Sequence, residues 1–213
     1  MVQIGGKPML WHIMDIYARY NHKNFFVALG HKGEIIKQYF SQVSEKWNIN
    51  LIDTGQKTMT GGRVKRIQKF IGNETFMLTY GDGLANINLK SLLSFHKKHG
   101  KLATMTAVTQ PGRYGSIKLS DDGTVLSFQE KPKLPSSGFI NAGIYVFSQQ
   151  LLADVKNLQM GSLEQDVLQK LPIGKLNVFS GKFDFLDIGT PEDYVRAQIF
   201  FRPFLKRWNS VKV

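Results

Sequence analysis

The feature that most constrains the fold is an alternation of short apolar segments with amphipathic ones over the first hundred residues. Segments 24–29, 50–53 and 76–80 have the apolar composition of strands. Residues 33–40, and the segment that begins at residue 60, carry apolar side chains at helical spacing. Because strands that alternate with helices over short connections are typical of a sheet covered by helices, the sequence predicts an α/β fold with a largely parallel sheet.

The pattern changes from residue 103 onward, where antiparallel strands are expected. Segments 116–119 and 124–128 flank Asp-Asp-Gly at 121–123, which predicts a hairpin. A long strand over 139–147 is interrupted at 141–143.

Helix boundaries are marked by capping residues. Asn88 and Thr190 precede two of the expected helices, and Pro8 suits a first helical position. Ser162 and Gln165 have the spacing of a capping box.

Composition limits the classes of protein to which the chain can belong. With 213 residues, 42% of them apolar, the chain suits one domain over 1–213. It has no cysteine, no run of 18 apolar residues and no signal-peptide pattern at residues 1–8, so we expect a cytoplasmic protein without a transmembrane segment. The net charge of +12 favours anionic partners, and no nucleic-acid-binding motif is present, so nucleotides and sugar phosphates are preferred over nucleic acid.

Two aspartates occupy matching positions at the ends of expected strands. Asp82 lies between two glycines just past segment 76–80, and Asp187 follows a strand pattern and precedes Gly189. Ligands of open α/β sheets bind at the carboxyl ends of strands, and paired carboxylates suit Mg²⁺ that carries a phosphate. The alternative is that Asp82 is an ordinary turn residue.

Glycines and basic residues predict contacts with phosphate and sugar groups. Thr60, Gly61 and Gly62 open a helix, and helix amino ends attract anions. Glu130 and Lys131 stand where Pro132 ends a strand, and there they could meet sugar hydroxyls and a phosphate. Each segment also has a structural interpretation: a tight connection in the first case and an exposed ion pair in the second.

Metal binding by histidine and covalent catalysis have little support. His96 and His99 share a helix face but have no carboxylate at helical spacing, so ordinary packing is the preferred interpretation. The chain has neither a Gly-x-Ser-x-Gly elbow nor a cysteine nucleophile.

Taken together and in order, these motifs resemble the sugar-1-phosphate nucleotidylyltransferases, and among them the glucose-1-phosphate cytidylyltransferases. The resemblance covers residues 1 to about 194. The segment 187–194 is more similar to the ending of heptose- or mannose-1-phosphate guanylyltransferases. The motifs that carry the resemblance are LIDTG (51–55), TMTGGR (58–63), TYGDG (79–83), HGKLAT (99–104), PGRYG (111–115) and FQEKP (128–132).

The resemblance implies a Rossmann-like, three-layer fold around a mixed, mainly parallel sheet, and a reaction between a nucleoside triphosphate, with CTP favoured, and a sugar 1-phosphate. Homo-oligomers are a further expectation. Asp82 and Asp187 would hold Mg²⁺, with Asp82 and Lys131 in catalytic roles. Thr60, Gly61 and Gly62 would line the base pocket, Tyr80 and Gly81 would lie near the ribose, and Gly115, Glu130, Lys131, Asn141 and Gly143 would hold the sugar phosphate.

The chain departs from the family pattern in two places. The family's first strand, glycine-rich loop and lysine would precede the segment that matches Met1, so we expect an N-terminally truncated fold with a gap in its sheet. An inactive nucleotide-sugar-binding remnant is an alternative. An insertion that is usual in cytidylyltransferases is absent between residues 40 and 50, which weakens the choice of CTP.

A basic aromatic tail covers residues from about 200 to 213. It could lie on an anionic membrane surface, but Pro203 is expected to interrupt a helix there, so a tail packed on its own domain is preferred. Its aromatic residues are Phe200, Phe201, Phe204 and Trp208, and its basic ones are Arg202, Lys206 and Arg207.

Overall fold

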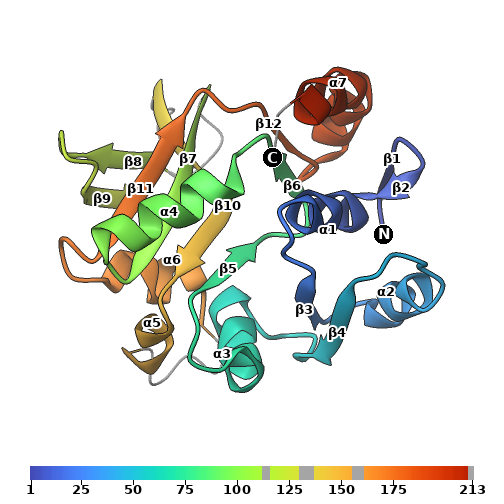
Figure 1. The fold of residues 1–213 in the computed structure, drawn as a ribbon, viewed down its shortest axis with the longest axis horizontal. Coiled ribbons are helices and arrows are strands. Elements are labelled where there is room, and N and C mark those ends of the chain that lie inside the picture. The colour runs from blue at the N-terminus through green and yellow to red at the C-terminus, as the bar shows by residue number, and fades with distance from the viewer. Residues whose placement is uncertain (112–115, 130–136, 155–160, 211–213) are drawn as a thin grey trace.

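The described residues fold around one mixed, six-stranded sheet (Figure 1). The structure is a computed structural model and describes residues 1–111, 116–129, 137–154 and 161–210. The central strand of the sheet is β10 (Ser137–Phe147), which has β7 (Ala103–Pro111) antiparallel along one edge. The other edge of β10 pairs with β5 (Phe76–Thr79) and β8 (Ser116–Leu119), while β9 (Val125–Gln129) adjoins β8 and β11 (Leu176–Gly181) runs parallel to β7.

Six more strands within these ranges form separate two-stranded sheets. They are β1 (Gln3–Ile4) with β2 (Lys7–Pro8), β3 (Asn24–Leu29) with β4 (Asn48–Asp53), and β6 (Gly83–Ala85) with β12 (Phe185–Asp187). Within the described residues, β3 pairs only with β4, so the expected gap between this pair and β5 is present. Among the described residues, the parallel strand pairs are β3–β4 and β7–β11. A mainly parallel sheet would have more, but β10 runs antiparallel to each of its neighbours.

Helices cover both faces of the sheet, as the three-layer prediction requires. The alternation of β10 shows this directly, because Ile144 and Val146 enter one core cluster while Tyr145 and Phe147 enter another. The first cluster lies beneath α1 (Met9–Arg19), α4 (Leu89–His99) and α7 (Pro191–Ser210). The second includes α5 (Gln149–Asp154), α6 (Leu163–Asp166) and the 3₁₀ turn Leu168–Lys170, and the remaining helices are α2 (Gly33–Phe40) and α3 (Thr60–Ile71).

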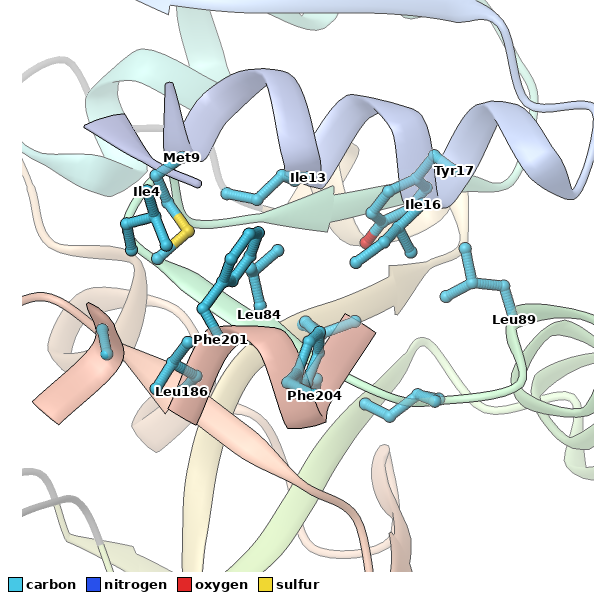
Figure 2. Close-up of a cluster of buried hydrophobic side chains, with 14 of the residues drawn as sticks. Ile4, Met9, Ile13, Ile16, Tyr17, Leu84, Leu89, Leu186, Phe201 and Phe204 are labelled. Atoms are coloured by element: carbon cyan, nitrogen blue, oxygen red, sulfur yellow. The ribbon is translucent and has the colours of Figure 1, made fainter. Parts of the chain in front are cut away.

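The first core cluster explains how the C-terminal helix is held. Phe201 and Phe204 point from α7 toward Ile13 and Ile16 of α1 and are 2% and 3% exposed (Figure 2). This burial favours the packed tail over membrane contact for these two rings. The prediction that Pro203 interrupts the helix is wrong, since α7 continues from Pro191 to Ser210. Proline removes one helical hydrogen bond, and packing of the two flanking phenylalanines offsets that loss.

Several predicted boundaries are confirmed. Strand β3 and helix α2 span the residues expected, and residues 41–47 make the short connection between α2 and β4. Asn88 caps α4 by accepting a hydrogen bond from Ser91 N, and the register of β10 against β7 shifts after Asn141, where the interruption was expected.

Other local predictions need correction. The side chain of Ser162 accepts a hydrogen bond from Gln165 N, but the reciprocal bond of the capping box comes from Asp166, whose carboxylate accepts from Ser162 N. Pro8 is the N-cap of α1 and not its first residue. The hairpin β1–β2 and strand β11 were not predicted. Among the described residues, no helix combines the length and hydropathy needed to cross a membrane.

Candidate active site

The two aspartates predicted from the sequence meet at one end of the β6–β12 ribbon. Asp82 lies between β5 and β6, and Asp187 is the last residue of β12, where it pairs with Gly83. The carbonyl oxygen of Asp82 accepts a hydrogen bond of 3.0 Å from Ile188 N. Backbone pairing therefore holds the two carboxylate-bearing residues side by side, although they are far apart in the sequence.

The carboxylates differ in their surroundings. Asp82 is exposed, whereas Asp187 is 9% exposed and its Oδ1 is buried with no hydrogen bond from the described residues. The pKa of Asp82 is raised above its ordinary value, first because neighbouring protein displaces water from its carboxylate and second because the charge of Asp187 is close. Asp187 thus forms the back of the site and Asp82 its open side.

Arg196 of α7 lies beside this pair and was not identified from the sequence. Its Nη2 donates a hydrogen bond of 2.9 Å to Asp193 Oδ1 and lies 3.6 Å from Asp187 Oδ1, too far for a hydrogen bond. Thr190 fixes Asp193 in turn, because its hydroxyl donates to Asp193 Oδ2 and accepts from Asp193 N. The spacing of three residues between Asp193 and Arg196 was a signal that could have been noticed.

The donor set fits a divalent cation that keeps other ligands. Among the described residues, no group of three or more His, Asp or Glu side chains is arranged to hold a metal. Asp82 and Asp187 could therefore supply two carboxylates, which matches the use of Mg²⁺ with water and substrate phosphates as its remaining ligands. The unbonded buried Oδ1 of Asp187 is the atom that such a cation would satisfy.

Tyr80, Asn141 and Gly143 are brought together beside the aspartates. Tyr80 N donates to Gly143 O at 3.1 Å, and the hydroxyls of Tyr80 and Tyr145 lie 3.1 Å apart. Asn141 links both ends of this network, since its Nδ2 donates to Tyr145 Oη at 2.5 Å and its Oδ1 accepts from Gly143 N at 2.9 Å. Gly143 has φ +68°, and a Cβ there would lie 2.6 Å from the ring of Tyr80. Tyr80, which was predicted to lie near the ribose, thus forms one rigid unit with Asn141 and Gly143, which were predicted to hold the sugar. Tyr145 also belongs to this unit and was not predicted.

The glycines at the start of α3 pack against another part of the protein. Thr60 Oγ1 accepts from Leu163 N at 2.9 Å and donates to Glu164 Oε2 at 3.1 Å. Gly62 N donates to Gly161 O, and a Cβ on Gly61 would lie 2.8 Å from the same oxygen. The close approach that glycine permits is therefore used within the protein, and the role of Thr60–Gly62 in binding a base stays a prediction.

Arg63 ties the carboxyl ends of two strands together and was not predicted to do so. Its Nη1 donates to Leu29 O at 2.9 Å, at the end of β3, and to Thr54 Oγ1 at 2.6 Å, just past β4. A Cβ at Gly30 would lie 2.5 Å from the Arg63 guanidinium, so a larger residue there would require this side chain to shift.

His96 and His99 are engaged inside the protein, as the preferred interpretation held. His96 Nδ1 lies 2.8 Å and His99 Nε2 2.7 Å from Thr104 Oγ1, and His96 Nε2 lies 3.2 Å from Ser148 Oγ. Burial, together with the nearby charge of His99, lowers the pKa of His96 to about 4.

Three predicted site residues, Gly115, Glu130 and Lys131, lie outside the described residues. Gly81 is exposed, and a Cβ there would have no heavy atom within 4 Å, so the backbone beside Asp82 is open to a ligand.

Comparison with known proteins decides the family. The model of the nucleotidyl transferase family matches residues 1–202. The chain belongs to this family. Among its relatives, glucose-1-phosphate cytidylyltransferase of Salmonella typhi is 41% identical over 194 residues, which cover 80% of this chain and 74% of the relative. UTP–glucose-1-phosphate uridylyltransferase of Synechocystis is 29% identical over 217 residues, which cover 92% and 56%. This nucleotidyl transferase is accordingly an enzyme of the sugar-1-phosphate nucleotidylyltransferase group.

Solved structures confirm the Rossmann-like α/β fold. HddC from Yersinia pseudotuberculosis superimposes with a TM-score of 0.83 at 28% identity, over 94% of this chain and 88% of HddC. A second structure of HddC, complexed with GMP-PN, gives a TM-score of 0.82.

Proposed function

We propose that this nucleotidyl transferase couples CTP to glucose 1-phosphate and forms CDP-glucose and pyrophosphate, a step that supplies precursors for surface polysaccharides. The observation that carries the proposal is the convergence of Asp82 with Asp187, whose buried Oδ1 accepts no hydrogen bond from the described residues. The choice of substrates is supported by the 41% identity to the Salmonella typhi cytidylyltransferase.

The reaction is a displacement at phosphorus. An oxygen of the sugar phosphate forms a bond to the α-phosphorus of the nucleotide, the bond from that phosphorus to the bridging oxygen breaks, and the electron pair leaves with pyrophosphate. Because the attacking oxygen already carries negative charge, no side chain has to remove a proton. The protein's task is to position two anions and to reduce their repulsion.

Each group of residues has a part in this positioning. Asp82 and Asp187 would hold Mg²⁺, which when bound supplies positive charge between the phosphates. Tyr80 and the open backbone of Gly81 would receive the ribose, and Asn141 and Gly143 the hexose. Thr60, Gly61 and Gly62 would contact the base, Gly115 and Glu130 the sugar, and Lys131 its phosphate.

A guanylyltransferase acting on a hexose or heptose 1-phosphate is the second candidate. It is favoured by the likeness to HddC, which has been solved with GMP-PN, at 28% identity. The end of β12 and the start of α7 also carry the segment 187–194 that is more similar to that group.

Pyrophosphate release distinguishes these candidates. The chain is incubated with Mg²⁺, with CTP, GTP, UTP or dTTP in turn, and with glucose 1-phosphate or mannose 1-phosphate. Turnover that is fastest with CTP and glucose 1-phosphate supports the proposal, and turnover fastest with GTP supports the second candidate. Nucleotide binding without turnover would identify a nucleotide-sugar-binding protein instead.

A matched pair of variants tests the site itself. Asp82→Asn should abolish turnover, while Asp184→Asn should keep it, because Asp184 accepts a hydrogen bond from Asn86 Nδ2 that an amide oxygen can also accept. Equal turnover in the two variants would refute the assignment of Asp82.

Self-association remains part of the proposal. Helix α7 exposes Val195, Ile199 and Phe200, which are 60%, 66% and 53% exposed, and such a stripe suits a contact between copies. Light scattering coupled to gel filtration measures the mass, and a monomer at all concentrations would contradict this part.

A further inference from the structure

A hollow of about 730 Å³ lies along α3, and neither Asp82 nor Asp187 lines it. One end is formed by the carboxyl end of β4, and the other by the residues that follow α3 and by the start of α5. A volume of this size is in the range of ligand sites, about 300–1,000 Å³. The lining residues are Ile52, Asp53, Lys65, Arg66, Gln68, Lys69, Phe70, Gly72, Asn73 and Gln149.

The charge in this hollow is mainly positive. Lys65, Arg66 and Lys69 line it, and among the described residues the lining has a single carboxylate, Asp53. Within the part of the chain that the structure describes, no carboxylate forms an ion pair with any of the three cations. Lys65 and Lys69 are four residues apart on one helix, where like charges destabilise each other, so an anion between them would relieve repulsion.

The hydrogen bonds that Lys65 and Arg66 donate do not neutralise their charge, which remains available to an anionic ligand. Lys65 Nζ donates to Gln68 Oε1 at 2.8 Å and Arg66 Nη1 to Thr54 O at 2.6 Å, and both acceptors are neutral. An ammonium carries three donors and a guanidinium five, so each group retains donors for a ligand. The bond to Thr54 also fixes the Arg66 guanidinium at the β4 end of the hollow.

The apolar part of the lining includes Phe70, whose ring is held by two contacts. Phe70 stacks on Phe26 of β3 with ring centroids 6.4 Å apart, and Lys69 Nζ lies 4.9 Å from the centre of the Phe70 ring. Both contacts hold the ring in place, and the neighbouring cations make the charge of a ligand more important than its apolar surface.

We propose that this hollow is a second binding site, for a polyphosphate group. Lysine and arginine bind phosphate oxygens through charge-assisted hydrogen bonds, and three cations against one carboxylate match a group with several negative charges. The polyphosphate is either free pyrophosphate or the triphosphate of a nucleotide. The site is separate from the aspartate pair, because none of Tyr80, Asp82, Asn141, Gly143 and Asp187 lines the hollow.

The test is calorimetric titration of pyrophosphate into the full chain in EDTA, which prevents metal-dependent binding at the aspartates. The variant Lys65→Gln/Lys69→Gln removes two charges from the hollow. The control Lys97→Gln/Lys98→Gln removes two charges from exposed positions on α4. We expect the first variant to weaken binding about tenfold or more, while the control stays within about twofold of the native chain.

A charge-preserving variant makes the test specific. Lys65→Arg/Lys69→Arg should bind pyrophosphate nearly as well as the native chain, which separates loss of charge from a folding defect. The proposal is overturned if the native chain does not bind, if the control loses as much affinity as the first variant, or if the first variant keeps its affinity.

Repeating the titration with CTP in EDTA identifies the source of the polyphosphate. A parallel loss of CTP affinity in Lys65→Gln/Lys69→Gln supports a nucleotide, and a loss confined to pyrophosphate supports the free anion. Because binding is measured without turnover, these results do not depend on the proposed function.

Discussion

The aspartate pair and the start of α3 are both glycine-flanked polar segments, but they differ in how their polar groups are satisfied. Thr60, Gly61 and Gly62 are occupied by residues 161–164 through hydrogen bonds and close backbone contact. Asp187 instead has a buried carboxylate oxygen that accepts no hydrogen bond from the described part of the chain, and Asp82 beside it is exposed. Polar groups that already have hydrogen-bond partners within the protein mainly stabilise the fold. A buried polar group without such a partner indicates a ligand.

His96 and His99 resemble Thr60–Gly62, because their polar atoms also have partners within the protein. His96 is 3% exposed, and both of its ring nitrogens lie within hydrogen-bonding distance of Thr104 or Ser148. The contrast between His96 and Asp187 therefore gives opposite expectations: substitution should affect stability at the histidine and activity at the aspartate.

Among the substitutions that test this comparison, Asp187→Asn should have the largest effect. Loss of the buried carboxylate should lower turnover by about 100- to 1,000-fold, because stabilisation of transferring phosphates by positive charge contributes several kcal/mol. The free energy of unfolding without metal should change little, since none of the described residues donates a hydrogen bond to Oδ1. Pyrophosphate release and urea denaturation measure the two quantities, and a large loss of stability with normal turnover would reverse the comparison.

The next effect is the acid sensitivity contributed by His96. Its pKa is about 4 in the folded protein against 6.5 for the ordinary side chain, so the unfolded chain binds more protons between these values. Stability should therefore fall as the pH falls from 6.5 to 4, by up to about 3 kcal/mol from this group.

Urea denaturation across this pH range checks the acid sensitivity. In His96→Gln the part of the pH dependence that His96 contributes should vanish, while His12, His22 and His99, whose pKa values burial also lowers, keep their own contributions. His31→Gln should keep it, because His31 is exposed. An unchanged slope in the His96 variant would contradict the assignment.

A pair of glycine substitutions compares the two segments directly. Gly61→Ala should destabilise the fold by about 1–3 kcal/mol, because its Cβ would lie 2.8 Å from Gly161 O. Gly81→Ala meets no heavy atom within 4 Å, so its stability should stay within about 0.5 kcal/mol of the native chain. If Gly81→Ala loses turnover while it remains stable, a ligand approaches the backbone at residue 81. If Gly61→Ala remains as stable as the native chain, the contact of α3 with Gly161 does not stabilise the fold.

The smallest effect is expected for Arg196→Gln. The guanidinium lies 3.6 Å from Asp187 Oδ1 and is partly open to solvent, so water screens its repulsion of a cation at that carboxylate. The variant should need less Mg²⁺ for half-maximal turnover, by at most about threefold. Arg19→Gln, which removes a surface pair with Asp15, is the control and should leave the Mg²⁺ requirement unchanged. A higher requirement in the Arg196 variant would show that the guanidinium orients the carboxylate.

Much of the local structure could be predicted because its causes lie within a few residues. The apolar segment 24–29 and the amphipathic segment 33–40 became β3 and α2 with the expected bounds. Asn88 and Thr190 cap helices through groups three residues away. The continuous helix through Pro203 was missed, because the packing of Phe201 and Phe204 that offsets the proline is made with α1, far away in the sequence.

The site was predictable only in part for the same reason. Asp82 and Asp187 could be selected because each follows a strand and precedes a glycine, and the structure pairs their strands. Tyr145 and the partners of Thr60 could not be selected, because their contacts depend on how separate elements pack. The pairing of Arg196 with Asp193 is local, but its position beside Asp187 depends on the same packing.

By itself, the sequence determined the α/β class, most strands and helices, and the two aspartates at strand ends, since periodicity, capping and turn residues act over short distances. Only the tertiary structure decided which polar groups were satisfied within the protein and which remained open to a ligand. The physical reason is that a buried donor or acceptor finds its partner through packing of distant segments: residues 161–164 occupy Thr60, while the Oδ1 of Asp187 accepts no hydrogen bond from the described residues.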